Sequence, residues 1–212
     1  MIVKYKSLYM RKGVYFMDKI SRKQQAENTK SKLLEISLRM IAEEGYDRVK
    51  ISDICNAAGV SVGAFYHHFQ NKAGIVIYAY LKCDDYFETE IYPEFKERHD
   101  KEAICDYLDY QMQYALNYGV DMVTQIYKAQ LTDGTDFFLS LDRGLPKGLI
   151  HMISNLQKNH VISDEFTASH IAQEILLISR GVIYNWCQLN GSYDLKEYNR
   201  QIISRYLNSY FL

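Results

Sequence analysis

The chain has 212 residues, of which 48% are hydrophobic and only two are proline. This hydrophobic content excludes a disordered protein, and the scarcity of proline favours long uninterrupted helices. No run of 18 or more apolar residues is present, and the charged amino terminus lacks the apolar segment of a signal peptide. We therefore expect a cytoplasmic protein that does not span a membrane.

Charge is distributed unevenly along the chain, although the net charge is only −1. Residues 1–75 hold 13 Lys and Arg against 7 Asp and Glu, whereas residues 76–212 hold 12 against 19. A basic end on an acidic body is typical of a protein that places that end on a polyphosphate such as DNA. Small basic regions are common, so the charge alone indicates nucleic-acid binding only weakly.

Residues 1–27 are predicted to form a basic amino-terminal extension. Residues 1–20 contain scattered aromatic side chains and show no periodicity, so we expect them to be partly disordered. The sequence MDKISRKQQ, which begins at Met17, resembles an ordinary amino terminus. Met17 is therefore a second candidate, beside Met1, for the first residue of the protein.

The rest of the sequence has the periodicity of α-helices. From Asn28 onward, apolar residues recur on one face, and glycine, serine, asparagine and proline interrupt the pattern. The predicted helices cover about residues 28–44, 51–58, 61–69, 71–93, 101–118, 120–131, 146–159, 164–190 and 195–211. Residues 133–144 form the one clearly irregular segment, and no strand pattern of any length occurs. The sequence therefore predicts an all-α chain of nine helices.

The segment 49–72, VKISDICNAAGVSVGAFYHHFQNK, has the features of two helices joined by a sharp turn. Gly59 supplies the backbone conformation that such a turn requires, and Ser61 is a good N-cap for the helix that follows. The small side chains of Ala57 and Ala58 allow the two helices to cross closely. The apolar residues predicted to point inward and to fix both helices against the preceding one are Ile54, Val60, Phe65 and Phe69.

The residues on the outer face of this segment are candidates for contact with DNA. In a helix-turn-helix motif the amino-terminal end of the second helix enters the major groove, and small residues there let the backbone approach the bases. The hydroxyl of Tyr66 and the imidazole of His67 suit phosphate oxygens, and His67 can also donate to a base edge. The complete candidate set is Lys50, Ser52, Ser61, Val62, Gly63, Ala64, Tyr66, His67 and Lys72. The alternative is that Tyr66 and His67 are packing residues of a helical protein.

The run AAGVSVGAFYHHFQNK, residues 57–72, resembles the signature of the TetR family of transcriptional regulators, and the resemblance covers about residues 30–77. It implies a DNA-binding domain at residues 28–75 and a ligand-binding and dimerisation domain at residues 76–212. By this resemblance, helices four to seven enclose a pocket for a small-molecule inducer. The resemblance also implies that helices eight and nine pair with their counterparts in a homodimer, and that this homodimer binds double-stranded operator DNA.

The chain departs from the family pattern at three places. Val49 and Lys50 stand where the family usually has threonine, so a phosphate contact at the start of helix two is less secure. Ala64 replaces a threonine of the recognition helix. Ala73 and Gly74 replace a frequent acidic pair, which weakens the start of helix four because favourable dipole interactions are lost and a glycine is gained.

The two carboxyl-terminal helices fit a dimer interface on their own sequence. Apolar residues cover more than one face of residues 171–186, and Gly181 permits close approach of another helix. The predicted interface residues are Ile171, Ile175, Ile178, Val182 and Trp186, with Ile202, Ile203, Tyr206 and Phe211 of the last helix. The alternative is that both helices belong to the core of the monomer.

Nine side chains in the body of the protein are candidates to line a ligand pocket, because they combine apolar surface with a few polar tips. They are Tyr107, Tyr110, Gln111, Tyr114, Met122, Tyr127, Phe138, His151 and Met152. Each of them is, taken alone, more typical of ordinary core or surface. An aromatic or amphipathic cation is a natural ligand for such a set, although no residue requires it.

These features favour a repressor that a small-molecule ligand releases from its operator. The alternative is a dimeric regulator controlled by a protein partner, which an occluded pocket and an exposed apolar patch would favour. An enzyme is not expected, because the chain has no phosphate-binding glycine loop, no GxSxG or HExxH motif and no Cys-His-Asp set.

No metal or cofactor is expected. The adjacent residues His67 and His68 lie about 100° apart on a helix and converge poorly on one ion. The four cysteines have no metal-ligand spacing and are expected to be buried reduced thiols, with a redox-sensing pair as the alternative. They are Cys55, Cys83, Cys105 and Cys187.

Overall fold

The computed structural model describes residues 21–132 and 138–210, and every regular element in these two ranges is a helix. The prediction of an all-α chain is thereby confirmed. Residues 1–20 of the predicted basic extension 1–27, and the question of Met17, lie outside the described residues, whereas residues 22–27 belong to a helix and not to an extension. Within the described ranges, no helix is long and apolar enough to cross a membrane.

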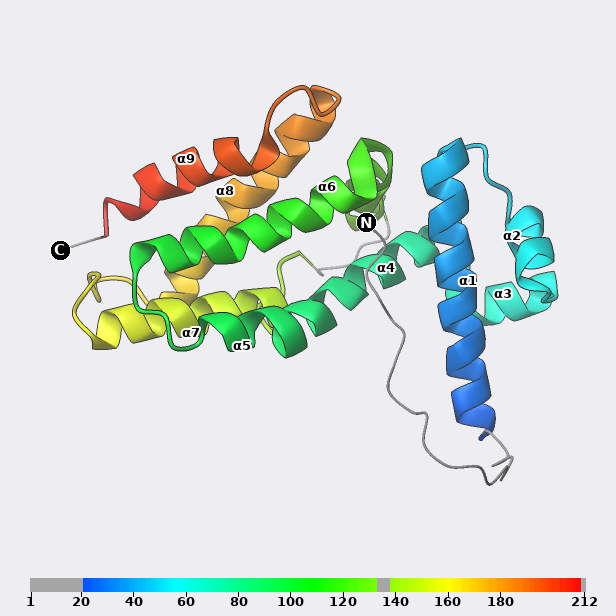
Figure 1. The fold of residues 1–212 in the computed structure, drawn as a ribbon, viewed down its shortest axis with the longest axis horizontal. Coiled ribbons are helices and arrows are strands. Elements are labelled where there is room, and N and C mark those ends of the chain that lie inside the picture. The colour runs from blue at the N-terminus through cyan, green and yellow to red at the C-terminus, as the bar shows by residue number, and fades with distance from the viewer. Residues whose placement is uncertain (1–20, 133–137, 211–212) are drawn as a thin grey trace, which may run out of the picture.

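Three helices form one end of an elongated molecule (Figure 1). They are α1 (Arg22–Glu44), α2 (Ile51–Ala58) and α3 (Val62–Phe69). Helix α1 begins at Arg22 and not at Asn28, as its apolar periodicity had suggested. Its first two turns are polar and exposed, and Ser21 caps them by accepting a hydrogen bond from the backbone N–H of Gln24. Apolar periodicity cannot locate helical turns whose side chains are all exposed.

Helix α4 (Lys72–Tyr86) leads from this end into the body of the protein (Figure 1). It continues without a break through a π-helical turn, η1 (Phe87–Ile91), into the short helix α5 (Tyr92–Phe95). The predicted end of the helix at Pro93 is therefore two residues early. Pro93 lies in the first turn of α5, just after this π-helical turn.

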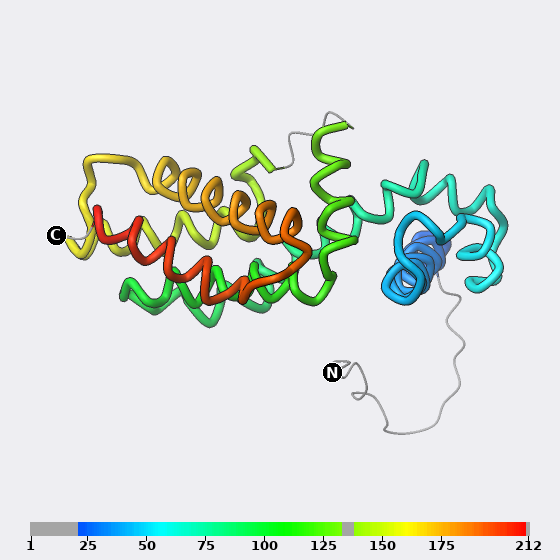
Figure 2. The backbone as a smooth tube through the Cα atoms, turned by 90° about the horizontal axis from the view of Figure 1, so that it is seen from above, coloured from blue at the N-terminus to red at the C-terminus, as the bar shows by residue number. Residues whose placement is uncertain are grey.

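Helix α6 (Lys101–Thr132) turns sharply at Gly119, where φ is 75°. The predicted break at this glycine is confirmed, and the two helices expected on either side of it are two arms of α6. A side chain at Gly119 would meet no other atom, so the backbone conformation is what requires glycine there. Helices α7 (Gly144–Lys158), α8 (Ala168–Gln188) and α9 (Leu195–Leu207) complete the body, with α8 and α9 side by side (Figure 2).

The hydrophobic core of the amino-terminal end does not stop at residue 75. Ile75, Val76 and Ala79 of α4 are fully buried in it, and Met122 and Ile126 of α6 join the same cluster. The hydrophobic core therefore extends across the predicted boundary at residue 75, because α4 packs in both the amino-terminal end and the body of the protein.

Helix α7 packs unusually closely on α4. A Cβ atom at Gly144 would lie 2.1 Å from the backbone oxygen of Asp84, and one at Gly148 would lie 2.2 Å from the hydroxyl of Tyr107. Arg143, just before α7, forms a two-pronged ion pair with Asp84, with N···O distances of 2.8 and 3.1 Å. Gly144 and the ion pair fix α7 against α4, and Gly148 lets α7 lie directly against Tyr107 of α6.

The apolar stripe that was predicted to form a dimer interface lies mostly inside the monomer. Ile171 and Ile175 are fully buried, and Val182 and Trp186 of α8 are also in the core. Ile203 of α9 is buried as well, Ile178, Ile202 and Tyr206 are half-buried, and Phe211 lies outside the described residues. The most apolar stripe of α8 packs against the core of the same chain. The sequence-based assignment of this stripe to a dimer interface was therefore wrong.

A different stripe of α8 faces solvent. Leu177 is 69% exposed and Tyr184 is 48% exposed, and Gly181 between them has open space beside it. Gln173 and Gln188 extend this stripe along the same face. The outward surface of α8 therefore combines apolar side chains with a flat position where another helix could approach closely.

Candidate nucleic-acid interface and ligand pocket

The turn between α2 and α3 has the geometry that the sequence predicted. Gly59 adopts a left-handed conformation with φ of 67°, and the N–H of Val60 donates to the carbonyl of Cys55 at 3.0 Å. Ser61 then caps α3, because its hydroxyl oxygen accepts from the N–H of Ala64 at 3.2 Å. Local hydrogen bonds thus determine the direction in which α3 leaves the turn.

Aromatic and aliphatic side chains hold α2 and α3 against α1. Ile54 and Phe65 have no exposed surface and Phe69 is 4% exposed, while Val60 is half-buried in the same cluster. Val49 is also fully buried, which explains an apolar residue before α2. Ala58 is buried at the helix crossing, whereas Ala57 is exposed and contributes nothing to it, contrary to the prediction.

The outer face of α3 is open to solvent at most of the predicted contact positions. Val62 is 45% exposed and Tyr66 is 49% exposed, and Ala64 is half-buried. The other exposed candidates are Ser61, Gly63 and His67 of the α3 region, with Lys50 and Ser52 at the start of α2. The hydroxyl of Ser52 donates to the carboxylate of Asp53 at 3.2 Å, so this hydroxyl is already engaged.

Lys72 is the candidate whose surroundings differ most from the expectation. Its ammonium group donates a hydrogen bond to the carbonyl of Tyr46, in the loop between α1 and α2, and lies 4.3 Å from the centre of the Tyr46 ring. Burial lowers the pKa of Lys72. In this conformation, Lys72 connects the start of α4 to the α1–α2 loop.

The glycine after Lys72 has a packing role that the sequence did not reveal. A Cβ atom at Gly74 would lie 2.0 Å from the carbonyl oxygen of Phe69. Asn71 caps α4, because its side-chain oxygen accepts from the N–H of Gly74 at 2.8 Å. Gly74 therefore permits α4 to begin directly against the end of α3, although it lowers the intrinsic helix propensity there.

The two adjacent histidines of α3 have different surroundings. Their ring centres are 5.3 Å apart, and His67 is exposed whereas His68 is half-buried. Burial, followed by the proximity of His67, lowers the pKa of His68. The described residues include no group of three metal-ligating side chains.

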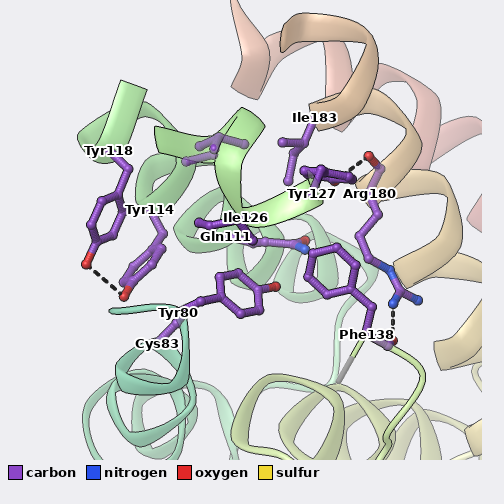
Figure 3. A pocket seen from close by; sticks show the side chains of 12 residues that line it. Tyr80, Cys83, Gln111, Tyr114, Tyr118, Ile126, Tyr127, Phe138, Arg180 and Ile183 are labelled. Atoms are coloured by element: carbon purple, nitrogen blue, oxygen red, sulfur yellow. Dashed lines mark hydrogen bonds between the residues drawn. The ribbon is translucent and has the colours of Figure 1, made fainter. Parts of the chain in front are cut away.

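A small cavity lies in the body of the protein between α4, α6, α8 and the segment before α7 (Figure 3). Its volume is about 30 Å³, which is room for no more than a few water molecules. Its lining is almost entirely apolar surface with a few polar tips. The lining residues are Tyr80, Cys83, Gln111, Tyr114, Ala115, Tyr118, Val123, Ile126, Tyr127, Phe138, Arg180 and Ile183.

Four of the nine predicted pocket residues meet at this cavity: Gln111, Tyr114, Tyr127 and Phe138. The other five, which the prediction had placed in the pocket, lie elsewhere: Tyr107, Tyr110, Met122, His151 and Met152. Tyr107 is fully buried, and its hydroxyl donates to the carbonyl of Leu145 at 3.1 Å. Met122 and Met152 belong to the packed core, and Tyr110 is half-buried with its hydroxyl 3.5 Å from the carboxylate of Glu94. His151 is exposed.

Three polar side chains at the cavity matter more than the sequence indicated. Arg180 and Tyr80 were not among the predicted pocket residues, and Gln111 was predicted without a specific role. Arg180 contributes a cation, and burial lowers its pKa. Burial raises the pKa of Tyr80 to about 12, so its hydroxyl stays protonated. The side-chain oxygen of Gln111 is buried and has no hydrogen-bond partner among the described residues. A signal for Arg180 was present in the sequence, because it is the one Lys or Arg in the mostly apolar stretch 171–186.

The cysteines agree with the prediction of reduced thiols. All four are free, three are buried and Cys187 is half-buried. Burial raises the pKa of each thiol, which disfavours the reactive thiolate. The cysteine that lines the cavity, Cys83, is therefore an apolar wall residue.

Comparison with known proteins finds similarity to one family of regulators, both in the helix-turn-helix and along the chain. Residues 33–79 match the model of the bacterial regulatory proteins of the tetR family. The HTH-type transcriptional regulator AcrR of Shigella flexneri is 22% identical over 204 residues, which is 90% of this chain and 93% of AcrR. The matched residues 33–79 contain the turn, the recognition helix and the start of α4.

Two solved structures extend the similarity over the body. Thermus thermophilus FadR, a TetR-family repressor in complex with lauroyl-CoA, has a TM-score of 0.69 at 14% identity, covering 84% of this chain and 93% of FadR. A transcriptional regulator from Saccharomonospora viridis in complex with choline has a TM-score of 0.61 at 19% identity, covering 86% of this chain and 96% of that one. At these identities the likeness is one of fold.

Proposed function

Because the chain belongs to the TetR family of DNA-binding transcriptional regulators, we propose that it is a homodimeric repressor that a small ligand releases from its operator. As a member of a family of regulators, it is not an enzyme. The observation that carries the proposal is that α4 connects two sites. It begins at the helix-turn-helix with Lys72 and lines the internal cavity with Tyr80 and Cys83.

We assign the contacts with DNA according to exposure and chemistry. Val62, Gly63 and Ala64 at the start of α3 are proposed to face base edges in the major groove, where small side chains allow close approach. The proposed phosphate contacts are Lys50, Ser52, Ser61, Tyr66, His67 and Lys72. For Ser52 this requires that its single O–H turn from the Asp53 carboxylate to the phosphate. For Lys72 this requires that the ammonium keep a hydrogen free beside its bond to Tyr46, which three N–H donors allow.

The homodimer is proposed to form through the exposed stripe of α8. Leu177 and Tyr184 would pack against the same residues of a second copy, and Gly181 would let the two helices approach. Dimerisation is needed because one short recognition helix contacts few base pairs, so useful specificity requires two half-sites.

The proposed signal from the cavity to DNA passes through the loop between α1 and α2. The N–H of Tyr46 in this loop donates to the carboxylate of Asp121 at 2.7 Å, and its carbonyl accepts from Lys72. Asp121 follows the turn of α6 at Gly119, and Tyr118 before that turn lines the cavity. A ligand that moves α4 relative to α6 would therefore move both supports of the loop.

Control by a protein partner is the second candidate function. It is favoured by the small volume of the cavity, because ligand sites usually measure about 300–1,000 Å³. The ligands in FadR and in the choline-bound regulator favour the small-molecule alternative, since those proteins have the same fold. The two candidates differ in whether a small molecule alone can dissociate the complex with DNA.

The test is an electrophoretic shift of DNA from upstream of the gene with the full-length protein. We expect binding that weakens steeply as salt rises, because phosphate contacts release counterions. Failure to shift any fragment of its own locus would contradict the operator proposal. Addition of a metabolite library to the complex then separates the two candidates: release by a small molecule supports the first, and release only by cell protein supports the second.

A further inference from the structure

The cavity in the body of the protein is filled by one of the protein's own side chains. The centre of the Phe138 ring lies 5.3 Å from that of Tyr80 and 5.2 Å from that of Tyr127, and both pairs are edge-to-face. The guanidinium carbon of Arg180 lies 5.5 Å from the centre of the same ring. Phe138 thus occupies a box made of two tyrosines and an arginine (Figure 3), and the cavity of about 30 Å³ is the space that remains.

Arg180 has no carboxylate partner among the described residues. Its Nε donates to the carbonyl of Leu176 at 2.8 Å, and its guanidinium also donates to the carbonyl of Phe138. Arg143 offers a comparison, because it is a buried arginine that is paired with the carboxylate of Asp84. The pKa of Arg143 is raised although burial acts to lower it, whereas burial leaves the pKa of Arg180 lowered. Arg180 is a partly desolvated cation that only neutral oxygens satisfy.

Gln111 is a second, independent sign of a missing ligand group. It is 5% exposed, it lines the same cavity, and its side-chain oxygen has no donor in the described residues. Buried polar atoms almost always have a hydrogen-bond partner, so each exception requires an explanation. A ligand that brings an O–H or N–H group into the cavity would supply the partner.

We propose that the pocket binds an aromatic carboxylate with a hydrogen-bond donor on its ring, a ligand class that deepens the ligand-responsive function proposed above. The aromatic ring takes the place of Phe138 between Tyr80 and Tyr127. The carboxylate takes the place of the Phe138 carbonyl on Arg180, and the donor pairs with Gln111. Phe138 offers an aromatic ring and an oxygen to the same box, so it is an internal stand-in for such a ligand.

A carboxylate has an advantage over the carbonyl that it displaces. The Phe138 carbonyl gives the Arg180 guanidinium one neutral acceptor oxygen. A carboxylate brings the opposite charge, and a guanidinium can hold both of its oxygens at once. The sequence had suggested a cationic ligand, but a cation would lie beside the charge of Arg180 with no counter-ion. Arg180 therefore favours an anionic ligand over the cationic one that the sequence had suggested.

The test measures binding of three matched probes to the full-length protein by calorimetry and thermal shift. They are 4-hydroxyphenylacetate, its neutral amide and the cation tyramine, with octanoate as an acid that has no ring. We expect the aromatic acid to bind at least tenfold more tightly than the other three. Equal or tighter binding of the amide, tyramine or octanoate would overturn the proposal, and so would failure of the aromatic acid to bind.

Two variants test the assigned roles. Arg180→Gln should weaken binding of the acid by about 10- to 100-fold and leave the amide unchanged, as expected for the loss of a charged hydrogen bond. Lys128→Gln is the matched control, because it removes an exposed positive charge from α6 and should change nothing. Phe138→Ala should strengthen binding of the acid, since the internal competitor is gone. Unchanged acid binding in Arg180→Gln, or weaker acid binding in Phe138→Ala, contradicts the proposal.

Failure of this inference can be distinguished from failure of the proposed function. If the acid binds but the operator complex persists, the ligand class is right and ligand-controlled repression is wrong. If a ligand of another class releases the operator while the aromatic acid does not bind, ligand-controlled repression is right and the proposed ligand class is wrong.

Discussion

Asp84 and Arg143 form the most buried ion pair in the described residues, with side chains that are 13% and 9% exposed. Removal of one partner from such a pair leaves an uncompensated buried charge, which costs far more than the pair itself contributes. This pair also orients Arg143 at the start of α7. Its integrity is therefore a condition for the close packing of α7 on α4.

We expect Asp84→Asn to lower the free energy of unfolding by about 3 kcal/mol, because the Arg143 guanidinium would stay buried without a counter-charge. The neighbouring variant Asp85→Asn is the control. Asp85 pairs with Lys82 at 3.0 Å, but it is 68% exposed, so its loss should change stability by no more than about 0.5 kcal/mol. Urea denaturation of both variants measures the difference, and equal effects would show that burial of the pair does not matter.

Two glycines of the DNA-binding end are expected to respond to alanine in opposite ways. Gly74→Ala should destabilise the protein by about 1–3 kcal/mol, because its Cβ would lie 2.0 Å from the carbonyl oxygen of Phe69. Gly63→Ala should stabilise it by about 0.5 kcal/mol, because the nearest atom would be 3.8 Å away and a glycine is removed from a helix.

Gly63→Ala should nevertheless weaken DNA binding, since the methyl group fills space that we assign to the major groove. Thermal melts and DNA titrations of both variants separate the two properties. A Gly63→Ala protein that is more stable and binds DNA as well as the original would remove Gly63 from the interface.

At the scale of elements, α3 presents two kinds of surface. The small residues at its start are candidates to distinguish sequences, and Tyr66 one turn later is a candidate to hold the backbone. The loss of a phosphate contact weakens binding to all sequences alike, whereas the loss of a base contact changes the order of preference.

Tyr66→Phe should therefore weaken binding to every operator variant by roughly two- to tenfold, the effect of one lost hydrogen bond. Val62→Ala should change the ranking of operator variants and affect their average affinity less. Titration of both proteins against a set of single-base operator variants measures this. The same pattern of change for the two variants would contradict the assignment of their roles.

The sequence was most informative about elements that are determined by residues close together in the chain. Gly59, Ser61 and the buried Phe65 were predicted because a turn, an N-cap and an inward-facing apolar position each require a characteristic residue type at a fixed spacing. The start of α1 was missed because its first turns bury nothing. Gly74 was misjudged because its role depends on the Phe69 carbonyl, which is close in space and separated by a turn.

The pocket was predictable only in part, because its residues meet through tertiary packing. Tyr107 and Gln111 are one turn apart on α6, yet Tyr107 points into the core and Gln111 into the cavity. Tyr80 and Arg180 join from helices that sequence cannot place side by side. The dimer stripe failed for a related reason: apolar periodicity identifies a buried face but does not say whether the protein's own core or a second copy buries it.

At the scale of the whole molecule, α8 lies in the body and α3 lies at the other end of the molecule (Figure 1). An interface at α8 can therefore be disrupted without any change in α3. Gly181→Arg should convert the proposed dimer to a monomer and leave the fold intact, because a side chain there meets no atom of the monomer. Sedimentation and circular dichroism check this. A variant that stays dimeric would place the interface elsewhere.

Recognition of an operator by the proposed dimer requires that two copies of the chain place α3 in successive major grooves of one operator. Hydroxyl-radical footprinting of the protein on the DNA upstream of its gene tests this directly. We predict two protected half-sites related by two-fold symmetry, with centres about one helical turn, or a multiple of it, apart. A single protected site without symmetry, or no protection at all, would contradict the claim.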